Sequence, residues 1–201
     1  MPFGARPTKY GGCEINAAAG IAGHDSLSGT SNWTITDGGL LGCFAPFITT
    51  WRTTSANEAI SIPTIGAGYD FDIDWGDGTT GHFAGTAPSV THTYAAAGDY
   101  QVKISGDFPR IYSNNGGDKL KILSVDQWGD VERTSMERAF MGCENLAILA
   151  SDAPDLSNAT NMEMMFQGAT HLTGYFNHWD VSTITNMSYL FAAGNFNQPL
   201  S

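Results

Sequence analysis

The feature that most constrains the fold is a repeat of about 25 residues in the last third of the chain. The matching columns, at spacings of 26 and then 25 residues, are Met136, Met162 and Met187, and Phe140, Phe166 and Phe191. A unit this short cannot bury its own apolar face, so consecutive units must stack to complete a shared core. The pattern therefore predicts a short solenoid of about three units over residues 127–201.

Each unit has the pattern of one short helix followed by a short extended stretch. Thr160 and Glu163 have the spacing of a capping box at a helix start. The Met and the Phe of one unit are four residues apart and would share a helix face. Gly168 stands where that helix should end, and Trp179 begins the extended stretch. The expected class for this part is a short α/β solenoid.

The segment 46–126 has the alternation of a β-sandwich. Residues 69–75 alternate strictly, with aromatic residues and isoleucine on one side and aspartates on the other. The other candidate strands are 99–105, 47–53, 59–62, 90–94, 110–112 and 120–125. Short strands with regular turns predict an Ig-like sandwich, so the whole chain should be mostly β with short helices in the repeats.

Three motifs in this segment are similar to the signature of the PKD (polycystic kidney disease) domain. They are Trp75-Gly76-Asp77-Gly78, then His92-Thr93-Tyr94, then Gly98-Asp99-Tyr100-Gln101-Val102. In that family these residues build the fold: the first motif ends a strand, and the tyrosine packs inside. The resemblance implies an Ig-like spacer or adhesion module without catalysis.

The repeat resembles the BspA-like bacterial surface-protein repeat, a relative of leucine-rich repeats. The resemblance is carried by residues 179–191, including Trp179, Met187 and Phe191, and by residues 196–201. The first unit departs from the pattern at residues 128–131. The resemblance implies surface proteins that bind hosts, matrices or other cells. Because another unit begins near residue 196, we expect the natural protein to continue beyond residue 201 or a partner to cap this end.

The charge argues against two classes of partner. The chain has 9 Lys and Arg against 20 Asp and Glu, a formal net charge of -11. Such a surface repels nucleic-acid phosphates and anionic lipids. No run approaches the roughly 18 apolar residues of a membrane span, and the N-terminus leads into no signal-peptide core. We expect no nucleic-acid partner and no membrane span.

A cluster of carboxylates offers the best candidates for a metal site. Asp70, Asp72 and Asp74 share one strand face, about 7 Å between successive members, and Asp77 follows in the turn. Their oxygen atoms suit calcium, although the spacing is not that of a calcium-binding loop. The alternative, which we favour, is a solvated strand face near Lys103. The chain carries no catalytic, zinc or nucleotide-binding motif, so we expect no catalytic residue and no cofactor.

Two other features bear on partners. Tyr175, His178 and Tyr189 are candidates for a binding face on the repeats, with ordinary surface or core as the alternative. Residues 1–45 form a Gly- and Ala-rich arm, either flexible or docked on a larger assembly. Cys13 and Cys43 form a disulfide only if their Cα atoms come within about 7 Å, and burial as small hydrophobic residues is the alternative.

Three functions fit these features. The first is a non-enzymatic virion component, a capsid decoration or tail-fibre protein, because exterior modules occur here without an export signal. Its arm would bind other virion proteins, as part of a homo-oligomer or larger assembly, and its repeats would bind a host-surface protein or glycan. The second is a bacterial cell-surface adhesin. The third is an accessory region of a carbohydrate-active enzyme.

Overall fold

The computed structural model describes residues 45–197, so the arm over residues 1–45, with Cys13 and Cys43, lies outside the described residues but for its last member. Across 45–197 the chain forms strands, turns and loops, and it has no helix that could span a membrane. In chain order the strands are β1 Phe47–Thr53, β2 Glu58–Pro63, β3 Tyr69–Asp74, β4 Thr80–Gly85, β5 Ser89–Tyr94, β6 Gly98–Asp107, β7 Ile122–Gln127, β8 Ala147–Ile148 and β9 Thr173–Gly174.

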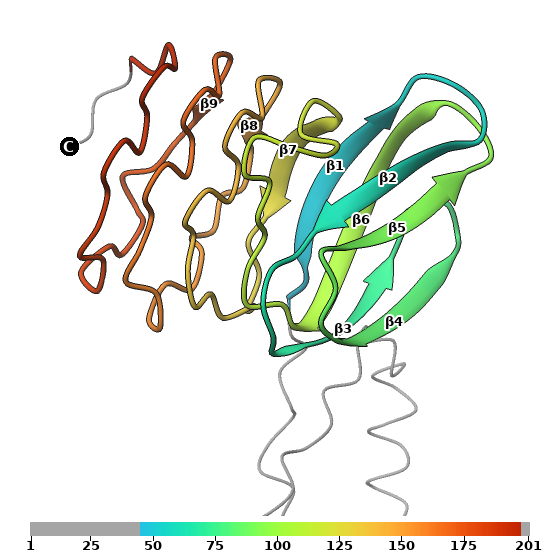
Figure 1. The fold of residues 1–201 in the computed structure, drawn as a ribbon, viewed down its shortest axis with the longest axis horizontal. Coiled ribbons are helices and arrows are strands. Elements are labelled where there is room, and N and C mark those ends of the chain that lie inside the picture. The colour runs from blue at the N-terminus through green and yellow to red at the C-terminus, as the bar shows by residue number, and fades with distance from the viewer. Residues whose placement is uncertain (1–44, 198–201) are drawn as a thin grey trace, which may run out of the picture.

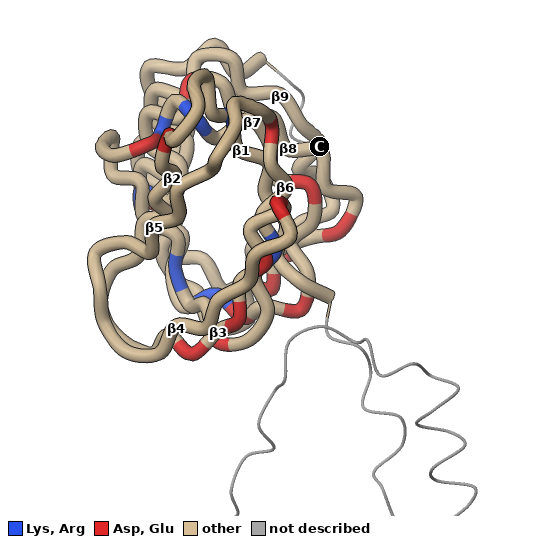
Figure 2. The backbone as a smooth tube through the Cα atoms, turned by 90° about the vertical axis from the view of Figure 1, so that its right-hand side faces the viewer, with Lys and Arg blue, Asp and Glu red and all other residues tan. Residues whose placement is uncertain are grey.

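The first half of the described chain is the expected Ig-like sandwich. One sheet has the order β4-β3-β6-β1-β7-β8-β9, and the second pairs β2 with β5. Figure 1 and the end-on view in Figure 2 show the two-stranded sheet facing the larger one. Alternate residues of both sheets fill the space between them and are fully buried, as with Phe47 and Phe71 on one side and Ile60 on the other.

One predicted sandwich strand is wrong, and one strand was not predicted. Residues 110–112 form no strand, because the Tyr112 amide donates to Pro63 and the Ser113 amide donates to Ala139, which bridges the sandwich and the repeats. Strand β4 had no sequence signal, since its glycines and His82 break the alternation. Its position follows from β3 through a tight turn in which the Trp75 amide donates to the Thr79 carbonyl.

The large sheet does not stop at the end of the sandwich. Strand β1 pairs antiparallel with β6 on one side and with β7 on the other. Strand β7 then pairs in parallel with β8, and β8 with β9. The boundary expected between residues 126 and 127 therefore falls within β7, and the sandwich and the repeats share one sheet and one continuous buried core.

Up to residue 197 the repeats contain none of the expected short helices, so this prediction is wrong. Arg138, Met164 and Tyr189 occupy equivalent positions and have φ values of 51°, 55° and 58°. A left-handed residue interrupts the helical hydrogen bonds, and the chain makes successive tight turns instead, such as Met165 N to Met162 O. The expected capping box does not form either, because the Glu163 amide is bound by the side chain of Asn161.

The repeat columns do stack as expected. We call residues 128–197 the ladder. The rings of Phe140 and Phe166 lie 5.8 Å apart and nearly parallel, and so do those of Phe166 and Phe191. Met136 and Met162 are buried beside them. Figure 1 shows these units as successive parallel turns leading away from the sandwich.

Candidate functional site

The PKD-like motifs meet at one end of the sandwich and hold each other in place. The buried Tyr94 hydroxyl donates to the Trp75 carbonyl at 2.9 Å. The His92 ring stacks on Trp75, and Tyr94 stacks on Tyr100 with ring centroids 3.9 Å apart. Gly76 has a φ of 79°, and a Cβ there would lie 2.5 Å from the Gln101 carbonyl oxygen. These contacts give the motif residues a structural role.

Asp77 and His92 form a hydrogen-bonded pair at this end of the sandwich. Their Oδ2 and Nε2 atoms are 2.7 Å apart, and Asp77 also accepts hydrogen bonds from the amide and hydroxyl of Thr79. Desolvation acts to raise the pKa of Asp77, but the hydrogen bonds from Thr79 and His92 outweigh it and lower this pKa to about 2. Asp77 therefore stays charged over the physiological range and fixes the His92 ring.

The aspartates of β3 do not converge with Asp77 on one point. Asp70 and Asp72 flank His82, at 3.4 and 2.9 Å, and Asp74 lies 3.7 Å from Lys103. Residues 45–197 contain no group of three or more acidic, His or Cys side chains placed to hold a metal ion. Asp70, Asp72 and Asp74 lie on a partly exposed strand face, where their carboxylates contact the side chains of His82 and Lys103.

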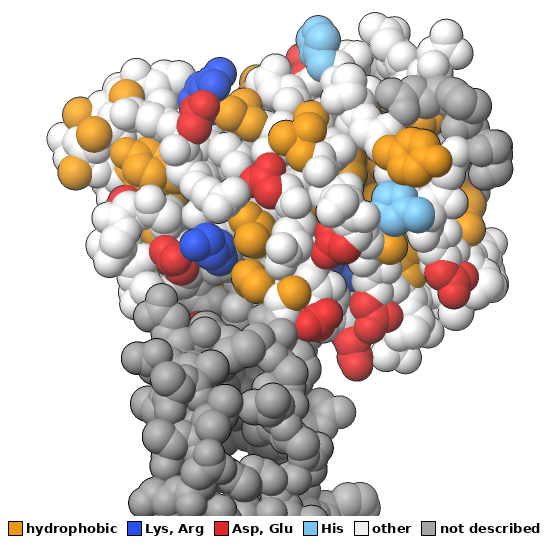
Figure 3. Space-filling view, turned by 180° about the vertical axis from the view of Figure 1, so that it is seen from behind, with side chains coloured by type: hydrophobic (Ala, Val, Ile, Leu, Met, Phe, Trp, Pro, Cys, Tyr) orange, Lys and Arg blue, Asp and Glu red, His pale blue; other side chains and the backbone are white. Residues whose placement is uncertain are grey.

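Of the candidate binding residues in the repeats, two lie together. The ring centroids of Tyr175 and His178 lie 5.8 Å apart in a stacked arrangement, and Tyr175 is 63% exposed. Tyr189 is equally exposed, but among the described residues it makes no ring contact with this pair. Trp179 instead packs inside the ladder against Trp128. Figure 3 shows hydrophobic, histidine and acidic side chains intermixed on the rear face.

A groove at the junction of sandwich and ladder was missed by the sequence analysis. It has a volume of about 960 Å³ and is lined by three segments, 61–67, 86–89 and 112–117. Because these segments are far apart in the sequence, no local sequence pattern predicts the groove. None of its described lining residues is charged; they are hydroxyl, amide, glycine and apolar residues together with the aromatic ring of Tyr112.

Hydrogen bonds from both sides fix the walls of the groove. The amides of Ser113, Asn114 and Asn115 donate to carbonyls of the first repeat unit, at 3.0 to 3.1 Å. On the sandwich side, the Thr64 amide and hydroxyl donate to the Pro88 and Ala87 carbonyls and join two of the loops. The protein's own hydrogen bonds therefore fix the shape of the groove walls, and no ligand is needed to form them.

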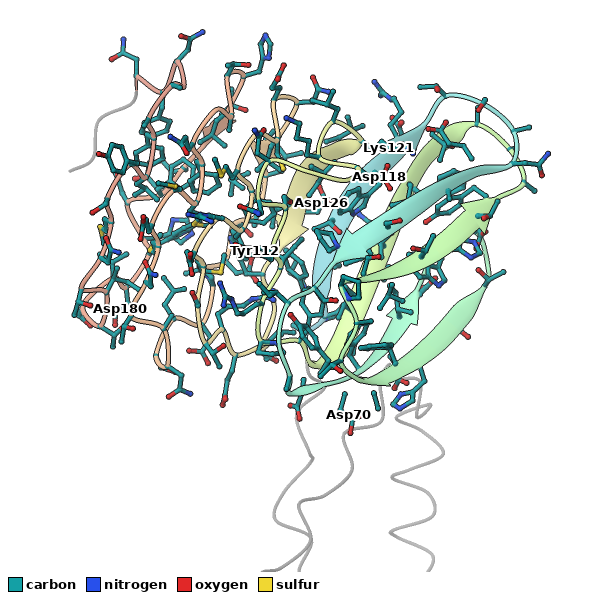
Figure 4. The ribbon with its side chains drawn as sticks, viewed as in Figure 1. Asp70, Tyr112, Asp118, Lys121, Asp126 and Asp180 are labelled. Carbon is teal, nitrogen blue, oxygen red and sulfur yellow. The ribbon has the colours of Figure 1, made fainter. Side chains whose placement is uncertain are left out.

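Tyr112 is the aromatic element of the groove and is half-buried. The Arg110 guanidinium lies 5.3 Å from the centre of its ring, and Arg138 Nη1 donates to its hydroxyl at 3.4 Å. Asp118 anchors the end of the same loop on β2, since its carboxylate accepts the Ser61 amide at 2.8 Å. Figure 4 shows Tyr112 and Asp118 beside β2, where the ladder begins.

Besides the groove, the buried side chain of Arg133 was also not predicted from the sequence. It is fully buried, with its guanidinium 4.2 Å from the Phe47 ring and Nη1 donating to the Phe108 carbonyl. Its Nε and Nη2 atoms have no hydrogen-bond partner. Burial lowers the pKa of Arg133 to about 9. Arg133 stands between the sandwich and ladder cores and has no access to a ligand.

Comparisons with known proteins match two parts of the chain. The model of the PKD domain matches residues 53–107. The model described as "Mycoplasma protein of unknown function, DUF285" matches residues 124–201. Neither matching model describes an enzymatic family, and no curated protein and no solved structure matches the chain. Residues 53–107 are a PKD-like, Ig-like domain, joined through β7 to a stretch similar to these Mycoplasma proteins.

Proposed function

We propose that this chain is a non-enzymatic, exterior binding protein that holds a neutral, hydroxyl-rich ligand, such as a glycan, in the junction groove. The observation that carries the proposal is the uncharged lining of the groove around Tyr112 in a chain of net charge -11. A sugar ring offers an apolar face to an aromatic ring and hydroxyl groups to neutral polar side chains.

The groove supplies both kinds of contact. Tyr112 gives a ring held in place by two arginines, so little side-chain entropy is lost on binding. Ser61, Thr86 and Asn114 bring hydroxyl and amide groups to the walls. These neutral groups can donate and accept hydrogen bonds, as a sugar hydroxyl requires. An anionic ligand, by contrast, would meet the repulsion of the acidic surface without a cation in the lining.

We place this binding activity on a virion as the first hypothesis. The arm of residues 1–45 would attach to other virion proteins in a homo-oligomeric or larger assembly. The sandwich and the BspA-like, leucine-rich-repeat-like ladder would project outward.

A bacterial cell-surface adhesin is the second candidate, favoured by the match of residues 124–201 to Mycoplasma proteins. Detecting this chain by mass spectrometry in purified phage particles supports the first hypothesis; surface labelling of intact cells supports the second.

The ligand proposal is tested by screening the full chain on an array of neutral and acidic glycans and measuring the affinity of each hit by calorimetry. We expect binding of neutral glycans. Tyr112→Ala should weaken it at least tenfold, and Tyr112→Phe should keep most of it because the ring remains. Leu149→Ala, on the exposed ladder surface and outside every candidate site, is the control and should bind normally. Unchanged binding by Tyr112→Ala would place the ligand elsewhere.

A further inference from the structure

We propose that this chain forms a two-fold dimer in which strand β4 of one copy pairs antiparallel with β4 of a second copy. The large sheet then runs without a break through both sandwiches. Three observations lead to this dimer: the open edge of β4, the closed edge of β2, and the fit of β4 to its own two-fold mate. The dimer is independent of the ligand proposed for the junction groove.

Strand β4 is the outermost strand of the large sheet, at the opposite end of the sheet from the ladder (Figure 1). The Trp75 amide donates to the Thr79 carbonyl at 3.0 Å, and the pairing of β3 with β4 continues from there without a register shift. Hydrogen-bonded and non-hydrogen-bonded pairs alternate between antiparallel strands. The odd-numbered residues of β4 therefore bond to β3, whereas the amides and carbonyls of Thr80, His82 and Ala84 point away from it.

Nothing in the described part of the chain closes this edge. Proteins usually protect an edge strand with charged side chains, proline or a bulge. Residues 80–85 contain no Asp, Glu, Lys, Arg or Pro, and Thr80, His82 and Ala84 are all exposed. Within residues 45–197, no group outside β3 forms a hydrogen bond with the backbone of these three residues. The edge is thus a regular row of free donors and acceptors.

The second sheet shows how this fold closes an edge elsewhere. On β2 the Ala59 carbonyl accepts a hydrogen bond from Lys121 Nζ at 2.6 Å, and the Ser61 amide donates to the Asp118 carboxylate at 2.8 Å. Because the Ser61 amide points away from β5, the amide of Thr93, opposite Ala59, points away from β2. The edge of β2 is therefore capped by side chains, and β5 provides a second open edge for comparison.

The open edge of β4 is complementary to itself. Each of its outward residues presents both an amide and a carbonyl, so two copies can pair around a two-fold axis. An axis at His82 gives the register with the most hydrogen bonds. It places His82 opposite His82 of the second copy, and Thr80 opposite Ala84 in both directions. These three pairs supply about six backbone hydrogen bonds, two for each pair.

The side chains on the inner face fit this register. It places Phe83 of each copy opposite Gly81 of the other. Phe83 is only partly buried and lies against Phe71 with ring centroids 5.5 Å apart, so a glycine opposite leaves room for its ring. Strand β5 lacks this fit, because a two-fold axis at its centre sets Val90 against His92, and both are large. The inner face therefore favours β4 over β5 as the dimer strand.

The charges on the outer face also fit. Asp72 is opposite His82 in the sheet, and its carboxylate lies 2.9 Å from the His82 ring. Across the axis the row becomes Asp72, His82, His82 of the second copy and Asp72 of the second copy. The imidazole rings thus stand between the carboxylates. Two chains that each carry a net charge of -11 meet here without setting acid against acid.

The first test measures self-association of the full chain by sedimentation velocity at increasing concentration. We expect a monomer–dimer equilibrium. Ala84→Pro should weaken it at least about tenfold, because proline removes an outward donor without breaking a bond to β3. Thr93→Pro makes the same change on the open edge of β5 and should dimerise normally. The dimer through β4 is overturned if the chain stays monomeric, or if Thr93→Pro abolishes the dimer and Ala84→Pro does not.

A cross-linking test fixes the register and does not depend on the folding of a proline variant. It uses a chain in which Cys13 and Cys43 are replaced by serine. In a hydrogen-bonded pair the Cα atoms are about 5.5 Å apart, a separation that a disulfide spans. We therefore expect mild oxidation to link two copies of His82→Cys.

The matched control is Thr80→Cys, which should give no linked dimer by itself, because the two Thr80 residues lie at opposite ends of the paired strands. An equal mixture of Thr80→Cys and Ala84→Cys chains should link. The proposed dimer is overturned if His82→Cys forms no linked dimer, or if Thr80→Cys alone links as readily.

Discussion

Replacing Phe166 or Phe191 by alanine compares the same chemical change at two positions of one column. Phe166 is 1% exposed and lies between the rings of Phe140 and Phe191. Phe191 stacks on Phe166 and, at 4.3 Å, on Phe196, but it is only partly buried. The two variants therefore differ mainly in whether the space left by the ring is closed or open to water.

The expected magnitudes follow from this difference. A buried Phe→Ala change costs about 3–5 kcal/mol, as lost transfer free energy plus the unfilled cavity. We expect Phe166→Ala to fall in this range. At Phe191 water can enter the space, so the cavity contribution largely disappears and the buried area lost is smaller. We expect about 1–2 kcal/mol there, the part of the roughly 1.5–3 kcal/mol of full burial that a partly exposed ring realises.

The assay is urea unfolding followed by tryptophan fluorescence and by far-UV circular dichroism. Because β1 pairs with both β6 and β7, we expect the sandwich and the ladder to unfold in one transition, which both variants shift to lower urea. Equal costs at the two positions would refute the burial argument. A Phe166→Ala variant whose sandwich unfolds separately at the wild-type midpoint would refute the shared core.

Three further changes test other parts of the structure. Asp77 has its pKa lowered from 3.8 to about 2 in the folded chain, so its stabilisation is complete above pH 4 and is lost as the pH falls toward 2. Asp77→Asn should therefore flatten the acid limb of a plot of thermal midpoint against pH. Arg133→Met should raise the free energy of unfolding by about 1 kcal/mol, measured in urea, because it removes an unpaired buried charge. Ala193→Gly should stabilise by about 0.5 kcal/mol in the same assay, because Ala193 has a φ of 55° where Gly142 and Gly168 stand in earlier units.

The sandwich was predictable where side chains alternate. Strand β3 and the PKD-like motifs carry their own signal, since alternation and a tight turn are local properties. The stacking of the Met and Phe columns was also predictable, because the repeat period fixes which residues of consecutive units meet. Strand β4 was not predictable, since its pairing comes from the turn before it and not from its own residues.

The helices were wrongly predicted because a spacing of four residues fits more than one backbone. The Met and Phe of a unit reach the same core from a chain of tight turns as they would from a helix. The left-handed conformation at Arg138, Met164 and Tyr189 selects the tight turns over a helix. None of these residue types predicts that conformation. The amides that a helix would use internally are bound instead by the next unit, a contact no window of sequence contains.

The groove and the shared sheet both depend on the junction between the sandwich and the ladder. One wall of the groove belongs to sandwich loops, and the segment 113–115 is hydrogen-bonded to the first repeat unit. A ligand that needs both walls binds only while the junction is intact. It must then stabilise the folded chain by RT ln(1 + [L]/Kd), about 2.7 kcal/mol at a hundredfold excess over Kd. With a single unfolding transition, this stabilisation reaches the ladder as well as the sandwich, although the ligand contacts neither Phe166 nor Phe191.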